Sequence, residues 1–322
     1  MIPPDLKTRV GDLRQFASVR RITLDDGPEC GVRALAFSTG GGLDFWTLSD
    51  RSLDIGPLWW RGQALAWQGH GGFQNPAYHD AEGDGGLGFN RSFSGFLVTG
   101  GLNHTRHPAD GQPLHGRLPF TPARVLAYGE DWDRNDPILF CAGEVVQARL
   151  GAEALRLRRR IETAIGGSSL TITDTVENLA NTPSQQASLY HFNLGFPAIA
   201  DGTIVEALGR RLLGPLQVPD ATLPSESVSY PVGTADFAGC TISTPRPDGS
   251  RLTIRFEWSA SSLPHLQLWH NLQPRVCVLS IEPCTSARRD GGLSAQEPIL
   301  EAGDIRRYVL RVTVAEASAP SP

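Results

Sequence analysis

Three short segments of the chain carry side chains that can move protons. They are LHGR (114–117), YHFNLG (190–195) and SIEP (280–283). Imidazole and carboxyl groups can each donate or accept a proton near neutral pH once their surroundings adjust the pKa. Taken singly, each segment also has an ordinary explanation, because a strand histidine is often structural and a glutamate at a strand end is often solvated.

Glu282 is the least ordinary of these residues. It closes the apolar run VCVLSIE (276–282), and on a strand it shares a face with Val276, Val278 and Ser280. A carboxylate on a mostly apolar face costs free energy unless it is paired or used. Glu282 is therefore a candidate functional residue.

The segments around these residues have the pattern of strands. Hydrophobic and polar residues alternate over 155–162, 170–176, 252–258 and 305–314, with glycine-rich turns between such segments. Helical periodicity is almost absent. Period-two alternation in this many segments predicts half-buried antiparallel strands, and so an all-β chain folded as a large antiparallel β-sandwich.

We expect a single domain over residues 1–322, because proline and glycine are spread along the chain rather than gathered in a linker. Residues 69–95 are rich in glycine and lack periodicity, which predicts a long ordered loop bordering a site. The last residues, EASAPSP (316–322), are expected to fray.

Composition excludes several classes of partner and compartment. The formal charge is -5, so no polycationic surface for nucleic acid is expected. No apolar run reaches the roughly 18 residues of a membrane helix, and the N-terminus does not read as a signal peptide. Five scattered cysteines fit no zinc motif. These features predict a soluble cytoplasmic protein, a monomer or a homodimer through exposed edge strands.

The order of the three segments resembles the motifs of the aldose 1-epimerase superfamily, which includes galactose mutarotase. That family carries Leu-His-Gly, then a His near Phe-Asn-Leu, then a Glu-Pro pair. Together with RSLDIG (51–56) and LYHFNLGFP (189–197), the pattern looks closest to a poorly characterised bacterial branch, over residues of about 40 to 315. The resemblance implies a galactose mutarotase-like supersandwich.

The resemblance also implies a reaction, the interconversion of α and β anomers of a sugar through the open aldehyde. By this likeness Glu282 is the base toward the anomeric hydroxyl and His191 is the acid toward the ring oxygen. His115 would bind and orient the sugar or share the acid role. Such chemistry needs no metal, nucleotide or covalent intermediate, so no cofactor is expected, and the partner is a monosaccharide or a derivative.

Candidate substrate-binding residues are less clearly marked, because the chain departs from the family pattern around them. Arg117 stands where galactose mutarotases have a second glycine, and the family's Asn-Arg-Ile-Ala segment is matched only loosely by Arg51 or by NRSF (90–93). Asn193 is a candidate for positioning. Trp269 could stack on the sugar ring or belong to the core.

Two other functions remain open. A metal-dependent sugar isomerase would use His104, His107 and His115, although His-x-x-His on a strand points the side chains to opposite faces. A non-catalytic carbohydrate-binding sandwich would use aromatic residues, namely Trp59, Trp60, Trp67 and Trp269.

The charge of the substrate is a separate open question. Arg117, Arg288 and Arg289 flank the predicted catalytic segments. They point to an acidic sugar such as a uronate, sulfonate or phosphate, or else are plain surface charge.

Overall fold

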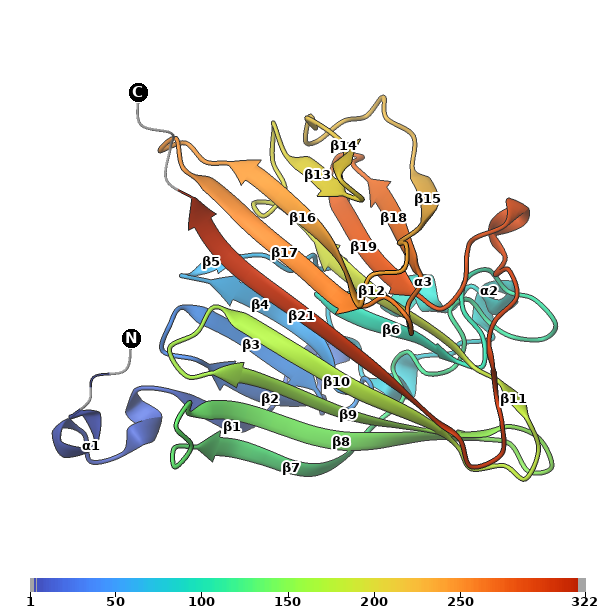
Figure 1. Ribbon diagram of the computed structural model, residues 1–322, viewed down its shortest axis with the longest axis horizontal. Coiled ribbons are helices and arrows are strands. Elements are labelled where there is room, and N and C mark those ends of the chain that lie inside the picture. Colours follow the sequence, from blue (N-terminus) through green and yellow to red (C-terminus); the bar gives the residue numbers. More distant parts are fainter. Residues whose placement is uncertain (1–2, 4, 318–322) are drawn as a thin grey trace.

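The structure is a computed structural model that describes residue 3 and residues 5–317. It consists of antiparallel sheets stacked on one another, with only short helices (Figure 1). The predicted all-β sandwich is therefore confirmed. Among the described residues, no helix is long and apolar enough to cross a membrane.

The largest sheet has nine strands, and its long members cross the centre of Figure 1. In spatial order they are β14 (Arg210–Leu213), β13 (Ile204–Ala207), β16 (Phe237–Pro245), β17 (Arg251–Ser259), β21 (Ile305–Ala317), β10 (Ser169–Asn178), β9 (Ala154–Ala164), β8 (Ile138–Ala148) and β7 (Arg124–Asp131). Buried and less buried residues alternate along β9, β10 and β17, as the sequence predicts for strands with one face on the core.

A second sheet is built from the N-terminal part of the chain. Its strands are β1 (Ser18–Thr23), β2 (Arg33–Ser38), β3 (Leu43–Leu48), β4 (Asp54–Trp60) and β5 (Gln63–Ala64). A small ribbon pairs β11 (Ser184–Gln185) with β20 (Ile299–Leu300). The helices are single turns: α1 (Leu6–Arg9), α2 (Gly83–Gly86), α3 (Phe89–Ser92), η1 (Leu13–Gln15), η2 (Gly27–Glu29), η3 (Pro76–Tyr78) and η4 (Asp290–Gly292).

The third sheet contains two of the predicted catalytic residues. Its strands are β15 (Glu226–Pro231), β18 (His265–Asn271), β19 (Val278–Cys284), β12 (Ala187–Leu194) and β6 (Leu97–Leu102). Every residue of β12 and β19 is buried. Tyr190, Phe192 and Ile281 face the hydrophobic core. Successive side chains of these strands therefore point alternately into the core and onto a second buried face, and not toward solvent.

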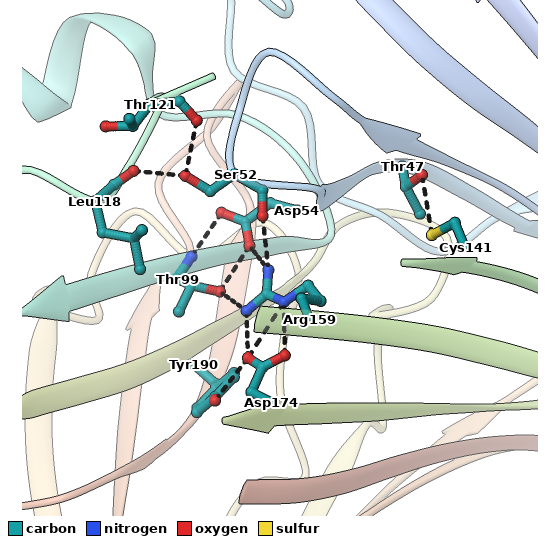
Figure 2. Close-up of polar contacts among 10 residues, drawn as sticks. All are labelled: Thr47, Ser52, Asp54, Thr99, Leu118, Thr121, Cys141, Arg159, Asp174 and Tyr190. Carbon is teal, nitrogen blue, oxygen red and sulfur yellow. Dashed lines mark hydrogen bonds and ion pairs between the residues drawn. The ribbon is translucent and has the colours of Figure 1, made fainter. Parts of the chain in front are cut away.

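A buried ionic cluster joins strands of all three large sheets (Figure 2). Arg159 on β9 contacts Asp174 on β10 at 2.7 Å and Asp54 on β4 at 2.5 Å. Thr99 on β6 donates its hydroxyl to Asp54, and Tyr190 on β12 donates its hydroxyl to Asp174. One hydrophobic cluster also contains residues of all three sheets, so the sheets share one core. A single domain over residues 1–322 requires such a shared core, and it stays a prediction.

Two local predictions need correction. The strand expected from Val276 begins at Val278, since Cys277 has a left-handed backbone that leaves the extended conformation. Glu316 and Ala317, expected to fray, belong to β21, where Ala317 pairs with Arg251 of β17. The remainder of the predicted frayed tail, 318–322, lies outside the described residues.

Candidate active site

Strand register brings three polar side chains into one row on the second buried face of the third sheet. The register that pairs Phe192 with Ile281 sets His191 beside Glu282, and Gln267 on β18 pairs directly with Glu282. Glu282 therefore has a histidine on one side and an amide on the other. This row is the floor of a cavity.

The cavity has a volume of about 210 Å³ and a buried floor beneath a more exposed mouth. Its size suits a small molecule rather than a drug-sized one. The lining comprises Leu87, Phe89, Asn90, Phe93, Arg106, His107, Leu114, His115, His191, Ser227, Gln267, Trp269, Glu282, Arg288 and Gly292.

The neighbours of His191 fix which of its ring nitrogens carries the proton. Asn193 donates its side-chain amide to the carbonyl of Gly95, so its oxygen faces His191 Nδ1, 2.5 Å away. Ser280 also donates its hydroxyl to that oxygen. An oxygen can only accept here, so His191 donates from Nδ1. Its Nε2 then presents a lone pair, 3.4 Å from Glu282 Oε1.

Glu282 is buried with one oxygen satisfied and one free. Gln267 donates its amide to Oε2 at 2.5 Å, and Arg106 holds that amide in place by donating to its oxygen at 2.7 Å. Among the described residues, Oε1 has no hydrogen-bond partner. Burial raises the pKa of Glu282 to about 8, opposed by the positive charge of Arg106 and the bond from Gln267. Burial likewise lowers the pKa of His191 to about 3.

His115 reaches the cavity from the loop after β6, with a left-handed backbone at φ 61°. Gly116 is required beside it, since a Cβ there would lie 2.3 Å from the carbonyl oxygen of Gly101. The backbone N–H of Arg106 points at His115 Nδ1, 3.3 Å away. This contact leaves Nε2 to carry the proton, so His115 can donate to a ligand. Burial holds the pKa of His115 well below its ordinary value, which keeps the ring neutral.

Residues 69–95, predicted as a loop that borders a site, contribute Leu87, Phe89, Asn90 and Phe93 to the cavity lining, and we call this segment the wall. Phe93 lies with its ring centroid 4.9 Å from His191 and 6.1 Å from Trp269, and Phe89 lies 4.7 Å from His115. These rings contribute to the burial that shifts the pKa values of His191 and Glu282.

The structure brings together some of the predicted site residues and separates others. Glu282, His191, His115 and Trp269 all line the cavity. Trp269 is half-buried and donates its indole N–H to Ser225, 3.0 Å away. Its ring and that of His191 lie edge to face, with the centroids 5.6 Å apart.

Arg51, Asn193 and Arg117, predicted to bind substrate, do not line the cavity. The buried Arg51 donates to the carbonyl of Ser92 and lies over the ring of Phe120, 4.3 Å from its centroid. Arg51 therefore anchors residues 69–95 without lining the cavity.

Asn193 orients His191. Its side-chain amide donates to the carbonyl of Gly95, and its side-chain oxygen accepts from the imidazole of His191. Arg117 points elsewhere and pairs with Glu82 at 2.7 Å. Both were predicted as sugar contacts because the sequence shows only their proximity to the motifs.

Of the residues that the two rival functions would use, His107, His115 and Trp269 line this cavity, whereas His104, Trp59, Trp60 and Trp67 do not. Among the described residues, no three His, Cys, Asp or Glu side chains come together as metal ligands do, and His104 Nε2 faces the carbonyl of His107 at 2.8 Å. Trp59 and Trp67 line a separate surface cavity with Phe196.

Sequence reasoning missed several residues of the site. Gln267 stands two residues before Trp269 on the same strand, so the period-two rule could have placed both on one face. Arg106 carries no such signal, because it lies in a loop with a left-handed backbone. Phe89 and Phe93 fall in the segment recognised only as a loop.

Comparison with protein families gives a clear match over most of the chain. The model of the family described as "Domain of unknown function (DUF4432)" matches residues 29–314. The chain belongs to this family. No curated protein matches the chain.

Solved structures share the fold of this DUF4432 chain. A "putative aldose 1-epimerase" from Klebsiella pneumoniae, 21% identical, gives a TM-score of 0.76 over 96% of this chain and 86% of its own. A galactose mutarotase-like protein from Clostridium acetobutylicum, 13% identical, gives 0.63 over 92% and 98%. Galactose 1-epimerase from Lactobacillus acidophilus, 9% identical, gives 0.56 over 93% and 99%. The predicted resemblance to this superfamily is confirmed in the fold.

Proposed function

We propose that the protein is an aldose 1-epimerase that interconverts the α and β anomers of a sugar by general acid and base catalysis. The observation that supports this most is the pair formed by His191 and Glu282. The two side chains are 3.4 Å apart on the floor of a closed-in cavity, and the free Oε1 of Glu282 is unsatisfied there among the described residues. A sugar hydroxyl would satisfy it.

Ring opening uses the pair in its ionic form, with Glu282 as carboxylate and His191 as imidazolium. Glu282 takes the proton of the anomeric hydroxyl while the C1–O5 bond breaks and a carbonyl forms at C1. His191 Nε2 gives its proton to the departing ring oxygen. After this step the sugar is the open aldehyde and both side chains are neutral.

Ring closure reverses these transfers after rotation about the C1–C2 bond. His191 takes the hydroxyl proton from O5 as the oxygen attacks the other face of C1, and Glu282 returns its proton to the new anomeric oxygen. Proton transfers balance over the cycle, so neither group is consumed. His115 donates to a sugar hydroxyl, and Trp269 with Phe93 packs against the ring.

The surroundings of the pair explain how one buried site can visit both forms. Burial favours the neutral form, as the raised pKa of Glu282 and the lowered pKa of His191 indicate. Gln267 stabilises the carboxylate by donating to it, and Asn193 stabilises the imidazolium by accepting from Nδ1. These bonds reduce the free-energy gap between the two forms, which a reversible proton transfer requires.

The direct test is Glu282→Gln, which keeps the shape of the side chain and removes the base. Anomer exchange should fall by about 10²-fold or more, the usual size of a general-base contribution. Sugar affinity should change much less, since glutamine can still hydrogen-bond the anomeric hydroxyl. Saturation-transfer NMR on the two anomers measures the exchange rate, and a titration measures the affinity.

His191→Asn should cause a similar loss of exchange. The double variant should lose less than the product of the two single losses, because acid and base act in one step. A folded Glu282→Gln protein that binds its sugar and exchanges anomers within a few-fold of wild type would remove Glu282 from the mechanism and contradict the proposed function.

A further inference from the structure

The cavity has a pronounced excess of positive charge for a sugar site. Its lining contains two guanidinium groups, Arg106 and Arg288. Among the described residues Glu282 is the only acidic side chain that lines it. Burial raises the pKa of this carboxyl to about 8 and so favours its uncharged form. The two arginines therefore face the cavity without a matching permanent negative charge.

Arg106 is buried with only uncharged partners. Its guanidinium donates to the Gln267 oxygen, the Ser286 carbonyl and the Cys284 sulfur, and its Nε has no partner among the described residues. A buried arginine normally has a carboxylate beside it, since an uncompensated charge is costly in low dielectric. Here no such ion pair is formed within the described chain.

Arg288 lies nearer the mouth and is half-buried. No side-chain hydrogen bond or ion pair of this residue is found among residues 5–317, although its charge is close enough to act on Glu282. Its backbone is fixed, because Arg288 and Ser294 form an antiparallel β-bridge across a turn. The backbone N–H of Ala295 donates to the carbonyl of Ala287 and closes the same turn. A positively charged side chain on an anchored backbone is thus held at the cavity without a partner.

We propose that Arg288 binds a negatively charged group of the substrate, so that the enzyme acts on an anionic aldose. This inference rests on the proposed function and names its substrate class. Arg106 adds to the same positive field from the floor. A carboxylate or a phosphate on the sugar would each accept hydrogen bonds from a guanidinium in this position.

The neighbouring Arg289 provides a matched control. It is exposed, it donates to the carbonyl of Ser294 at 3.0 Å, and it does not line the cavity. Arg288→Gln and Arg289→Gln change the net charge equally. Any effect through the long-range field appears in both variants, whereas loss of a direct contact appears only in the first.

The experiment compares affinities at physiological salt for matched ligands: glucose with glucuronate and with glucose 6-phosphate, and galactose with galacturonate. Wild type should bind at least one anionic sugar about tenfold more tightly than its neutral counterpart, as expected for a charge-assisted hydrogen bond. Arg288→Gln should abolish that preference, Arg288→Lys should restore part of it, and Arg289→Gln should retain it. The uronate and phosphate arms show which anion is preferred.

Equal binding of neutral and anionic sugars, or equal losses in the Arg288 and Arg289 variants, would overturn the inference. Anomer exchange is measured separately by saturation transfer, so the two proposals can fail independently. Tight binding of an anionic sugar without exchange would contradict the epimerase and support the role of Arg288 in binding an anion. Exchange of neutral sugars without any preference for anions would support the epimerase and overturn this inference.

Discussion

His191 Nε2 and the carboxyl of Glu282 between them hold a single proton over a wide pH range, in addition to the proton that stays on His191 Nδ1. The pKa of His191 is lowered to about 3 and that of Glu282 is raised to about 8, so between these values the pair carries one proton. The proposed anomer exchange needs that one proton, since it moves from the anomeric oxygen side to the ring oxygen side and back.

Anomer exchange should therefore be lost on the alkaline side. As the pH rises above about 8, Glu282 gives up the proton of the pair, and none remains for delivery to the ring oxygen. The enzymatic rate should fall about tenfold per pH unit beyond that point, with one proton released. Saturation transfer between pH 6 and 10 measures this, after subtraction of the uncatalysed rate, which rises with hydroxide. A rate that stays constant to pH 9.5 would contradict the one-proton assignment.

The wall formed by residues 69–95 depends on a side chain outside the cavity. Arg51 is buried, donates to the carbonyl of Ser92, the last residue of α3, and lies over Phe120. Burial lowers the pKa of Arg51, and the negative charges of Asp54 and Glu29 act in the opposite direction. The strength of this attachment should govern how often the wall opens.

Arg51→Met should loosen the wall without disturbing the floor. Amides in residues 69–95 should exchange with deuterium about tenfold faster, as expected for the loss of a hydrogen bond from a charged donor. Amides of β12 and β19 should keep their protection. Arg91→Gln is the control, because Arg91 belongs to the same segment but pairs with Asp84 in solvent. Unchanged protection of 69–95 in Arg51→Met would show that other contacts hold the wall.

The same elements show how far sequence reasoning reaches. Alternation identified β9, β10, β17 and β21, because a strand with one face on the core must alternate. Glu282 and His191 could be found because their motifs are local. Gln267 and Arg106 were missed, since their contact with Glu282 depends on strand register and a left-handed loop. Arg51 was predicted to bind the sugar, because the sequence does not reveal in which direction a buried cationic side chain points.

At the scale of the whole molecule, the three large sheets depend on the cluster around Arg159 (Figure 2). This guanidinium compensates two buried carboxylates, those of Asp54 and Asp174, which lie in different sheets. Burial raises the pKa of Asp54, while Arg159 and Thr99 act in the opposite direction. Removal of the arginine would leave both acids without an ion-pair partner among the described residues.

Arg159→Met should be strongly destabilising, by about 3–5 kcal/mol, because an uncompensated buried charge remains. The melting temperature should fall by about 10 °C. Arg160→Met on the same strand should cost no more than about 1 kcal/mol, since Arg160 pairs with Glu162 near the surface. Thermal unfolding of both variants gives the comparison. Equal losses of stability in the two variants would mean that the Arg159 cluster stabilises the packed sheets no more than an ion pair near the surface does.

The complete burial of β12 and β19 has a consequence for how this protein can evolve. Each floor residue also belongs to a central strand, so a substitution there changes the packing of the molecule as well as its chemistry. The wall, in contrast, is a glycine-rich connection with no strand of its own. Under the proposed function, mutational drift toward new sugars should therefore accumulate in the wall while Glu282 and His191 persist. A library designed for altered specificity is best concentrated on residues 86–93.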